Sequence, residues 1–157
     1  MLLKLVFVIS MIGGIGYMNF QNMKRYGDIY NKPPFYGIYK TNIFIIGNDT
    51  LPPLNTNSKR WKELIIQQNG AKIISMTDSS ERYKVDVDTI KNRIIFTSIK
   101  QIDVKYNLQY QSNKTTMTLA GNWGKDSLKV ILNRIDINKF LLLNRGFHWI
   151  NDYPFNK

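Results

Sequence analysis

The sequence contains no cysteine, and its 157 residues include a single histidine, His148. Without cysteine the chain forms no disulfide, offers no thiolate to zinc and has no thiol nucleophile. One histidine is too few for a nitrogen-based metal site, and no calcium-loop spacing is present. A glycine-rich phosphate loop and the GxSxG and HExxH motifs are also missing. We therefore expect no metal, no cofactor and no motif-based catalysis.

Acidic residues are scarce as well: the sequence has 11 Asp and Glu residues and 22 Lys and Arg residues, which gives a net charge of +11. Such an excess suits a nucleic acid or an anionic membrane as partner. However, the basic residues are scattered, and no nucleic-acid-binding motif accompanies them. The many Lys, Asn, Ile and Tyr residues indicate an AT-rich coding sequence. We interpret the charge as compositional and expect no nucleic-acid partner, with a dedicated anion-binding surface as the alternative.

The longest stretch without a charged residue lies near the start of the chain, and we expect residues 1–20 to form a transmembrane helix. The alternative is a secretory signal peptide, which would place the rest of the chain in the periplasm or outside the cell. No cysteine follows, so a lipoprotein is excluded. Lys24 and Arg25 favour a cytoplasmic soluble domain by the positive-inside rule, whereas Lys4 opposes it.

Residues 21–34 read as a linker, because Pro33-Pro34 excludes helix there. From residue 35 to residue 157 apolar and polar residues alternate with a period of two, which is typical of half-buried strands. Turn residues recur about every ten positions, as in all-β folds. The strands we expect are 38–46, 60–67, 71–77, 82–88, 93–98, 104–111, 115–123 and 127–134, followed by a helical turn at 136–139 and a strand at 140–143. We predict an antiparallel meander closed as a barrel of about eight strands.

Four segments of this domain carry a resemblance: residues 37–39, 52–54, 60–66 (RWKELII) and 145–156 (RGFHWINDYPFN). They resemble the C-terminal domain that follows the membrane helices of some bacterial DoxX-like proteins, over roughly 37–157. DoxX-like proteins are small membrane proteins of four helices, and their founding members are linked to thiosulfate:quinone oxidoreduction. This chain has one hydrophobic segment, so that redox chemistry is not carried over. The resemblance implies an accessory domain, in a shortened relative or a stand-alone form, with a DoxX-like membrane protein as partner.

A second resemblance concerns how the barrel closes. Gly37-x-Tyr39 and Arg145 are similar to the lipocalin-like (calycin) arrangement, in which an arginine from the far end of the chain covers an aromatic of the first strand. That resemblance implies a structural role for Arg145. The alternative is that Arg145 faces inward and pairs with a ligand carboxylate or phosphate.

Aromatic residues supply the candidate ligand contacts. In the expected register Tyr83, Tyr106 and Tyr110 face the interior, and Trp61 could line a pocket or pack in the core. In the C-terminal segment the candidates are Arg145, His148 and Trp149. We expect a membrane-tethered barrel that binds a small apolar or anionic ligand; the alternative is an interaction module that docks on a partner membrane protein. An enzyme using His148 with Asp152 is less favoured, since a lone histidine among aromatics is more often packed and hydrogen-bonded.

Overall fold

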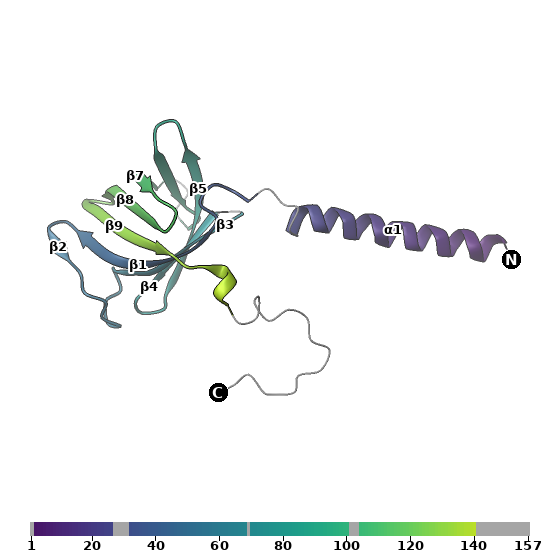
Figure 1. Ribbon diagram of the computed structural model, residues 1–157, viewed down its shortest axis with the longest axis horizontal. Coiled ribbons are helices and arrows are strands. Elements are labelled where there is room, and N and C mark those ends of the chain that lie inside the picture. Colours follow the sequence, from purple (N-terminus) through teal and green to yellow (C-terminus); the bar gives the residue numbers. More distant parts are fainter. Residues whose placement is uncertain (1, 27–31, 69, 101–103, 141–157) are drawn as a thin grey trace. The chain divides into compact units, whose positions relative to one another are not determined.

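A computed structural model describes residues 2–26, 32–68, 70–100 and 104–140 of the chain (Figure 1). The chain divides into two compact units, Met1–Pro33 and Pro34–Lys157. The first unit contains helix α1 (Leu2–Tyr26), which confirms the expected N-terminal hydrophobic helix and continues past residue 20. Within the described residues, no helix combines the length and the apolar character that crossing a bilayer requires. Our expectation of a transmembrane helix is therefore not supported.

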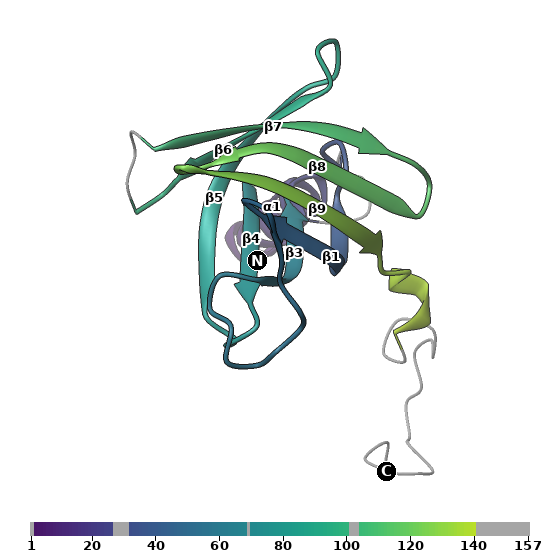
Figure 2. The ribbon, with the colours of Figure 1, turned by 90° about the vertical axis from the view of Figure 1, so that its left-hand side faces the viewer.

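The second unit is a closed antiparallel barrel, as the period-two pattern predicts. β1 pairs with β3, each strand from β3 to β8 pairs with the next along the chain, and β1 also pairs with β9, which closes the sheet on itself (Figure 2). The two-residue strand β2 folds back on the end of β1, so eight strands form the barrel wall. The strands are β1 (Gly37–Ile46), β2 (Asp49–Thr50), β3 (Trp61–Gln67), β4 (Gly70–Ser75), β5 (Ser80–Asp88), β6 (Arg93–Ser98), β7 (Lys105–Ser112), β8 (Thr116–Trp123) and β9 (Asp126–Arg134).

The expected strands agree with these bounds to within two residues at each end, and the expected helical turn is the 3-10 helix η1 (Ile137–Lys139). The sequence pattern did not indicate β2. Phe140 caps η1 and belongs to no strand, and the remainder of the expected strand at 140–143 lies outside the described residues. The lipocalin-like likeness stays a prediction.

Large side chains fill the barrel interior. Alternate residues of each strand point inward, as in β9, where Leu128, Val130 and Leu132 are buried and Lys129 is exposed. An eight-stranded barrel has an interior that side chains can fill. The largest fully buried side chains are Phe44, Phe96, Leu64, Ile94, Leu108, Met117, Leu119, Leu132 and Val130. The middle of the barrel is therefore a packed core, and its two ends decide what the protein can bind.

One hairpin depends on glycine. Gly70 begins β4 with φ at +136°, and a Cβ on it would lie 2.1 Å from the carbonyl oxygen of Tyr83 on β5. A backbone carbonyl cannot move aside without breaking the ladder between the two strands. The backbones of β4 and β5 therefore leave no room for a side chain at position 70.

Candidate functional site

The end of the barrel where β1 begins, called the closed end below, is sealed by Phe35, Tyr39, Tyr110 and Arg134. The ring of Phe35 packs edge-on against Tyr110, with ring centroids 4.7 Å apart. The Tyr39 hydroxyl donates to the carbonyl oxygen of Phe35 at 2.9 Å. Burial raises the pKa of Tyr39, and the charge of Arg134 partly opposes that rise. The polar groups of this end thus bond to neighbouring backbone of the same chain.

Arg134, at the end of the last strand, lies beside the start of β1, whereas the lipocalin-like resemblance implied such a place for Arg145. It lies opposite Tyr39 in the β1–β9 ladder and donates to the carbonyl oxygen of Tyr36 at 3.0 Å. A Cβ on Gly37 would approach the Arg134 Nε to 3.3 Å, so the absence of a side chain there lets the guanidinium lie against β1. Arg145 itself lies outside the described residues.

The opposite end of the barrel carries a cluster of six aromatic rings: Phe44, Trp61, Tyr83, Phe96, Tyr106 and Trp123. Trp123 is at its centre. Its ring stacks on Tyr106 with centroids 3.9 Å apart and meets Trp61 edge-on at 4.9 Å and Tyr83 at 5.5 Å. Aromatic pairs of this kind add about 0.5–1.5 kcal/mol each beyond the area they bury. The cluster therefore forms a rigid floor.

Above this floor lies an open cavity of about 300 Å³, called the mouth pocket below. It is lined by Phe44, Ile46, Ser58, Lys59, Trp61, Ile73, Ser75, Ser79, Glu81, Tyr83, Trp123 and Asp126. Aromatic and aliphatic groups supply one part of the lining, and hydroxyl and charged groups supply the other. Ligand sites combine a mostly apolar wall with a few directed polar groups, and this volume is at the lower end of their range of roughly 300–1,000 Å³.

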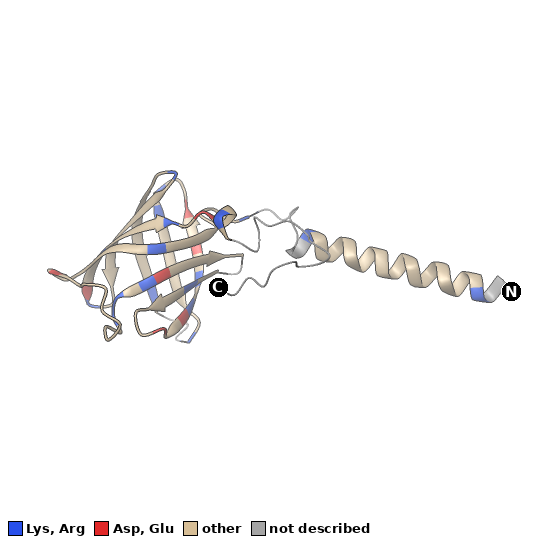
Figure 3. Ribbon diagram, turned by 60° about the horizontal axis from the view of Figure 1, so that its bottom comes forward, with Lys and Arg blue, Asp and Glu red and all other residues tan. Residues whose placement is uncertain are grey.

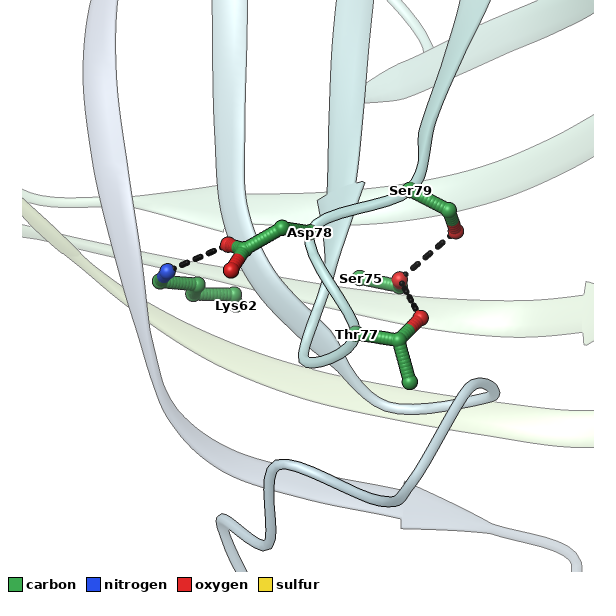
Figure 4. A network of polar contacts seen from close by, with 5 residues as sticks. All are labelled: Lys62, Ser75, Thr77, Asp78 and Ser79. Carbon is green, nitrogen blue, oxygen red and sulfur yellow. Dashed lines mark hydrogen bonds and ion pairs between the residues drawn. The ribbon is translucent and has the colours of Figure 1, made fainter.

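Three hydroxyl groups form a chain at the rim. The Ser75 Oγ lies 2.8 Å from both Thr77 Oγ1 and Ser79 Oγ, so one hydroxyl from the inner row of β4 links the two arms of the β4–β5 turn (Figure 4). On the outer side of the same turn Lys62 pairs with Asp78 at 2.5 Å, the ion pair that the described residues contain. Being exposed, that pair contributes little stability. The hydroxyl chain is therefore what keeps Ser75 and Ser79 at the pocket.

Tyr83 and Glu81, two positions apart on β5, both point into the mouth. The Tyr83 hydroxyl donates to Glu81 Oε2 at 2.5 Å. Burial is the main cause that raises the pKa of Tyr83, and the hydrogen bond and charge of Glu81 raise it further. Tyr83 is therefore a neutral donor at physiological pH, and Glu81 is an acceptor held in place by it.

Arg60 is a buried cation that precedes the pocket residue Trp61 and bonds to neighbouring backbone. Beyond the Lys40↔Glu63 pair, β3 leaves β1, and the β1–β9 ladder shifts register between Thr41 and Ile43. The Arg60 guanidinium occupies this split and donates to the carbonyl oxygens of Leu51 at 2.7 Å and Asn42 at 3.1 Å. Its side chain is 3% exposed, its Nε has no partner among the described residues, and burial lowers its pKa. Arg60 thus replaces missing strand pairing next to Trp61.

The structure separates the residues that we expected to act together. Trp61 and Tyr83 line the mouth pocket, and Tyr106 supports its floor through Trp123. Tyr110 lies at the closed end against Phe35. The candidates Arg145, His148 and Trp149, and Asp152 with them, lie outside the described residues.

The polar residues of the pocket were missed by the sequence reasoning, although a signal was present. Glu81 precedes Tyr83 by two positions and therefore shares its face of β5, and Ser75 continues the inner row of Ala71 and Ile73. A carboxylate and a hydroxyl on an inward row, at the point where strands end, indicate a polar rim. Asp126, two positions before the inward Leu128 on β9, carried the same signal, whereas Lys59 precedes β3 and carried none.

Comparisons with protein-family models, with curated proteins and with solved structures find no match to this chain.

Proposed function

We propose that this protein is a membrane-attached binding protein whose barrel holds a small ring-containing molecule in the mouth pocket. The observation that carries the proposal is the pairing of an aromatic floor, formed by Trp61, Tyr83 and Trp123, with a rim of serine hydroxyls and carboxylates. A flat apolar ring can pack on the floor while its polar substituents bond at the rim. A ligand with only apolar surface would leave the rim unpaired, which costs free energy.

The charges at the rim favour a neutral or cationic ligand over an anionic one. One ammonium group, Lys59, faces two carboxylates, Glu81 and Asp126. Tyr83 already occupies one oxygen of Glu81, which leaves the other to accept from a ligand hydroxyl or amine. Of the two ligand classes that the sequence suggested, the apolar one is thus the better match, provided that it also carries a hydrogen-bond donor.

Membrane attachment is assigned to α1. Its apolar side chains are largely exposed, with Leu5, Phe7, Ile12 and Met18 each more than 60% exposed. Exposed apolar side chains on a helix are stabilised by contact with apolar material, and the membrane interface supplies that environment. Fractionation of cells expressing the full chain tests this part: recovery in the membrane pellet after a high-salt wash supports it, and release into the supernatant contradicts it.

The binding proposal is tested with two probes that share one ring, benzyl alcohol and benzoate. In saturation-transfer NMR on the full chain we expect transfer to benzyl alcohol and markedly less to benzoate, since the carboxylate probe meets two like charges. The double variant Glu81→Gln/Asp126→Asn should raise the benzoate signal, and the matched control Asp49→Asn on β2 should not. Equal transfer to both probes in the unaltered chain, or none to either, would contradict the proposal.

A second candidate function is an interaction module, and the packed barrel interior favours it, because most of the barrel offers no room for a ligand. The DoxX-like resemblance makes a DoxX-like membrane protein the partner to test. On α1 the glycines 13, 14 and 16 leave open space around the backbone, which suits close approach of another helix. Co-purification in detergent that Gly14→Leu abolishes, with Ser10→Leu as control, would support this candidate; an uncomplexed chain would count against it.

A further inference from the structure

The outer surface of β6, β7, β8 and β9 has a charge pattern that the mouth pocket does not explain. The outward rows of these strands consist of Arg93, Ile95 and Thr97 on β6, Lys105, Asn107, Gln109 and Gln111 on β7, Thr116, Thr118, Ala120 and Asn122 on β8, and Ser127, Lys129, Ile131 and Asn133 on β9. Three of these side chains are cations and none is a carboxylate. Figure 3 shows the distribution of basic and acidic residues over the barrel.

The same surface is hollowed. Two adjoining cavities, of about 760 and 460 Å³, lie along β7 and β8 and share Gln109 and Ala120. Both cavities are lined by Ala120, whose small side chain belongs to the outward row of β8 and leaves this part of the surface open. The two cavities together are called the outer groove below.

The lining of the outer groove is suited to phosphate groups. Four exposed cations border it, namely Lys91, Arg93, Lys105 and Lys129. Side-chain amides and hydroxyls between them, such as Asn107, Gln109 and Thr118, can donate hydrogen bonds. Among the residues that the structure describes, no carboxylate lines either cavity, and none of the four cations forms an ion pair with a described residue.

Two carboxylates of β5 adjoin the β6 side: Asp86 lies opposite Ile95 and Asp88 lies opposite Arg93 in the β5–β6 ladder. The Asp88 Oδ1 accepts from the backbone N–H groups of Ile90 and Lys91 at 3.0 Å each and so holds the β5–β6 turn. Neither carboxylate lines the two cavities.

We propose that the outer groove binds the phosphate-bearing headgroups of an anionic phospholipid membrane. The positive charges of the groove complement the negative charges of the lipid phosphate groups. Each Lys or Arg close to an anionic bilayer strengthens binding by about fivefold. Single-stranded nucleic acid is disfavoured as the occupant, since successive bases need free aromatic faces to stack on. The aromatic lining residues are Tyr106 and Tyr110, and their rings already pack against Trp123 and Phe35. This surface does not involve the mouth pocket, so the two proposals stand or fall separately.

The test measures partition of the full chain into vesicles of phosphatidylcholine alone and of phosphatidylcholine with 30% phosphatidylserine, a composition we choose for the assay. Insertion of apolar side chains of α1 contributes to the partition coefficient for either kind of vesicle. The ratio of the two partition coefficients therefore isolates the effect of lipid charge. The triple variant Arg93→Gln/Lys105→Gln/Lys129→Gln should lower that ratio about 100-fold. Raising the salt concentration should lower the ratio of the unaltered chain as well.

The matched control removes the same number of charges from the outward rows of β4 and β5: Lys72→Gln/Arg82→Gln/Lys84→Gln. We expect it to keep most of the preference for phosphatidylserine. An equal loss in both triple variants would show that net charge alone acts, and would overturn the proposal. So would a ratio near one for the unaltered chain, or groove-dependent binding of a single-stranded oligonucleotide without any preference for phosphatidylserine.

Discussion

The two ends of this barrel are built from the same kinds of residue and yet behave differently. At the closed end Tyr39 and Arg134 direct their polar groups to backbone carbonyls of Phe35 and Tyr36, so the residues that plug the end satisfy one another. At the mouth Tyr83 bonds to Glu81, a side chain that itself lines an open cavity. A tyrosine bonded to backbone seals the barrel, whereas a tyrosine bonded to a partly accessible carboxylate orients that group toward a ligand.

Support for the two ends differs as well. At the closed end β1 is paired on both sides, with β3 from Gly37↔Ile66 to Lys40↔Glu63 and with β9, whose ladder along β1 continues to Ile46↔Leu128 near the mouth. Near the mouth β3 has left β1, and the Arg60 guanidinium bridges the split with two hydrogen bonds to carbonyl oxygens. We therefore expect side-chain substitutions to damage the mouth more than the closed end, and the predictions below test this ranking from the largest effect to the smallest.

Trp61→Ala should have the largest effect. The ring is 4% exposed and contacts Phe44, Phe96 and Trp123, so its removal leaves a cavity in the floor of the mouth pocket. We expect a loss of about 3–5 kcal/mol in the free energy of unfolding, measured by urea denaturation. Trp61→Phe keeps an aromatic ring and should lose clearly less; equal losses would mean that the floor does not depend on ring packing.

Arg60→Ala should follow, with a loss of about 2–3 kcal/mol, since it leaves the carbonyl oxygens of Leu51 and Asn42 without their charged donor. Arg60→Lys restores a cation but cannot span both oxygens, so an intermediate stability is expected. The same urea denaturation measures both variants. If Lys proved equivalent to Arg, the guanidinium would not be bridging the split between β1 and β3.

Arg134→Ala, at the closed end, should cost about 1 kcal/mol, because one exposed hydrogen bond to the Tyr36 carbonyl is lost while the β1–β9 ladder remains. Arg93→Ala is the control: this exposed arginine makes no such bond among the described residues, and we expect a change below about 0.5 kcal/mol. A loss at Arg134 as large as that at Arg60 would contradict the difference between the two ends.

The smallest effect at neutral pH is expected for Tyr83→Phe, and its signature lies in alkaline solution. The pKa of Tyr83 is raised above 10.0 in the folded state, so the folded state holds this proton more tightly than the unfolded state does. The resulting stability is complete below pH 10 and is lost as the pH rises above that value, by at most about 1.4 kcal/mol per pH unit. Stability curves between pH 8 and about pH 11.5 should therefore fall less steeply for Tyr83→Phe than for the unaltered chain. Parallel stability curves for Tyr83→Phe and the unaltered chain would contradict the raised pKa of Tyr83.

Much of the fold followed from local pattern. Alternation such as Leu128, Val130 and Leu132 against Lys129 and Asn133 located the strands, because one face of a barrel strand is always buried. Turn residues between the runs indicated a meander. The shift between Thr41 and Ile43 and the short β2 were not predicted, since both depend on how β1 meets β3 and β9.

The site was predicted less well. Trp61 and Tyr83 were named and lie at the mouth, but nothing local distinguished them from Tyr110, which faces the same interior and lies at the opposite end. Period two tells which face a residue is on and not how far along the barrel it lies relative to residues of other strands. Lys59, Glu81 and Asp126, from three different parts of the chain, come together only when the ladder closes.

The amino-acid sequence by itself determined the class of fold, the strand positions and the inward rows, because the burial of alternate side chains is a local property of each strand. Only the tertiary structure decided that Arg134 lies against Gly37, that one end is plugged and the other open, and that a groove with no carboxylate among its described lining residues crosses β6–β9. These features depend on the register between strands and on the pairing of β1 with β9, which brings the two ends of the domain together.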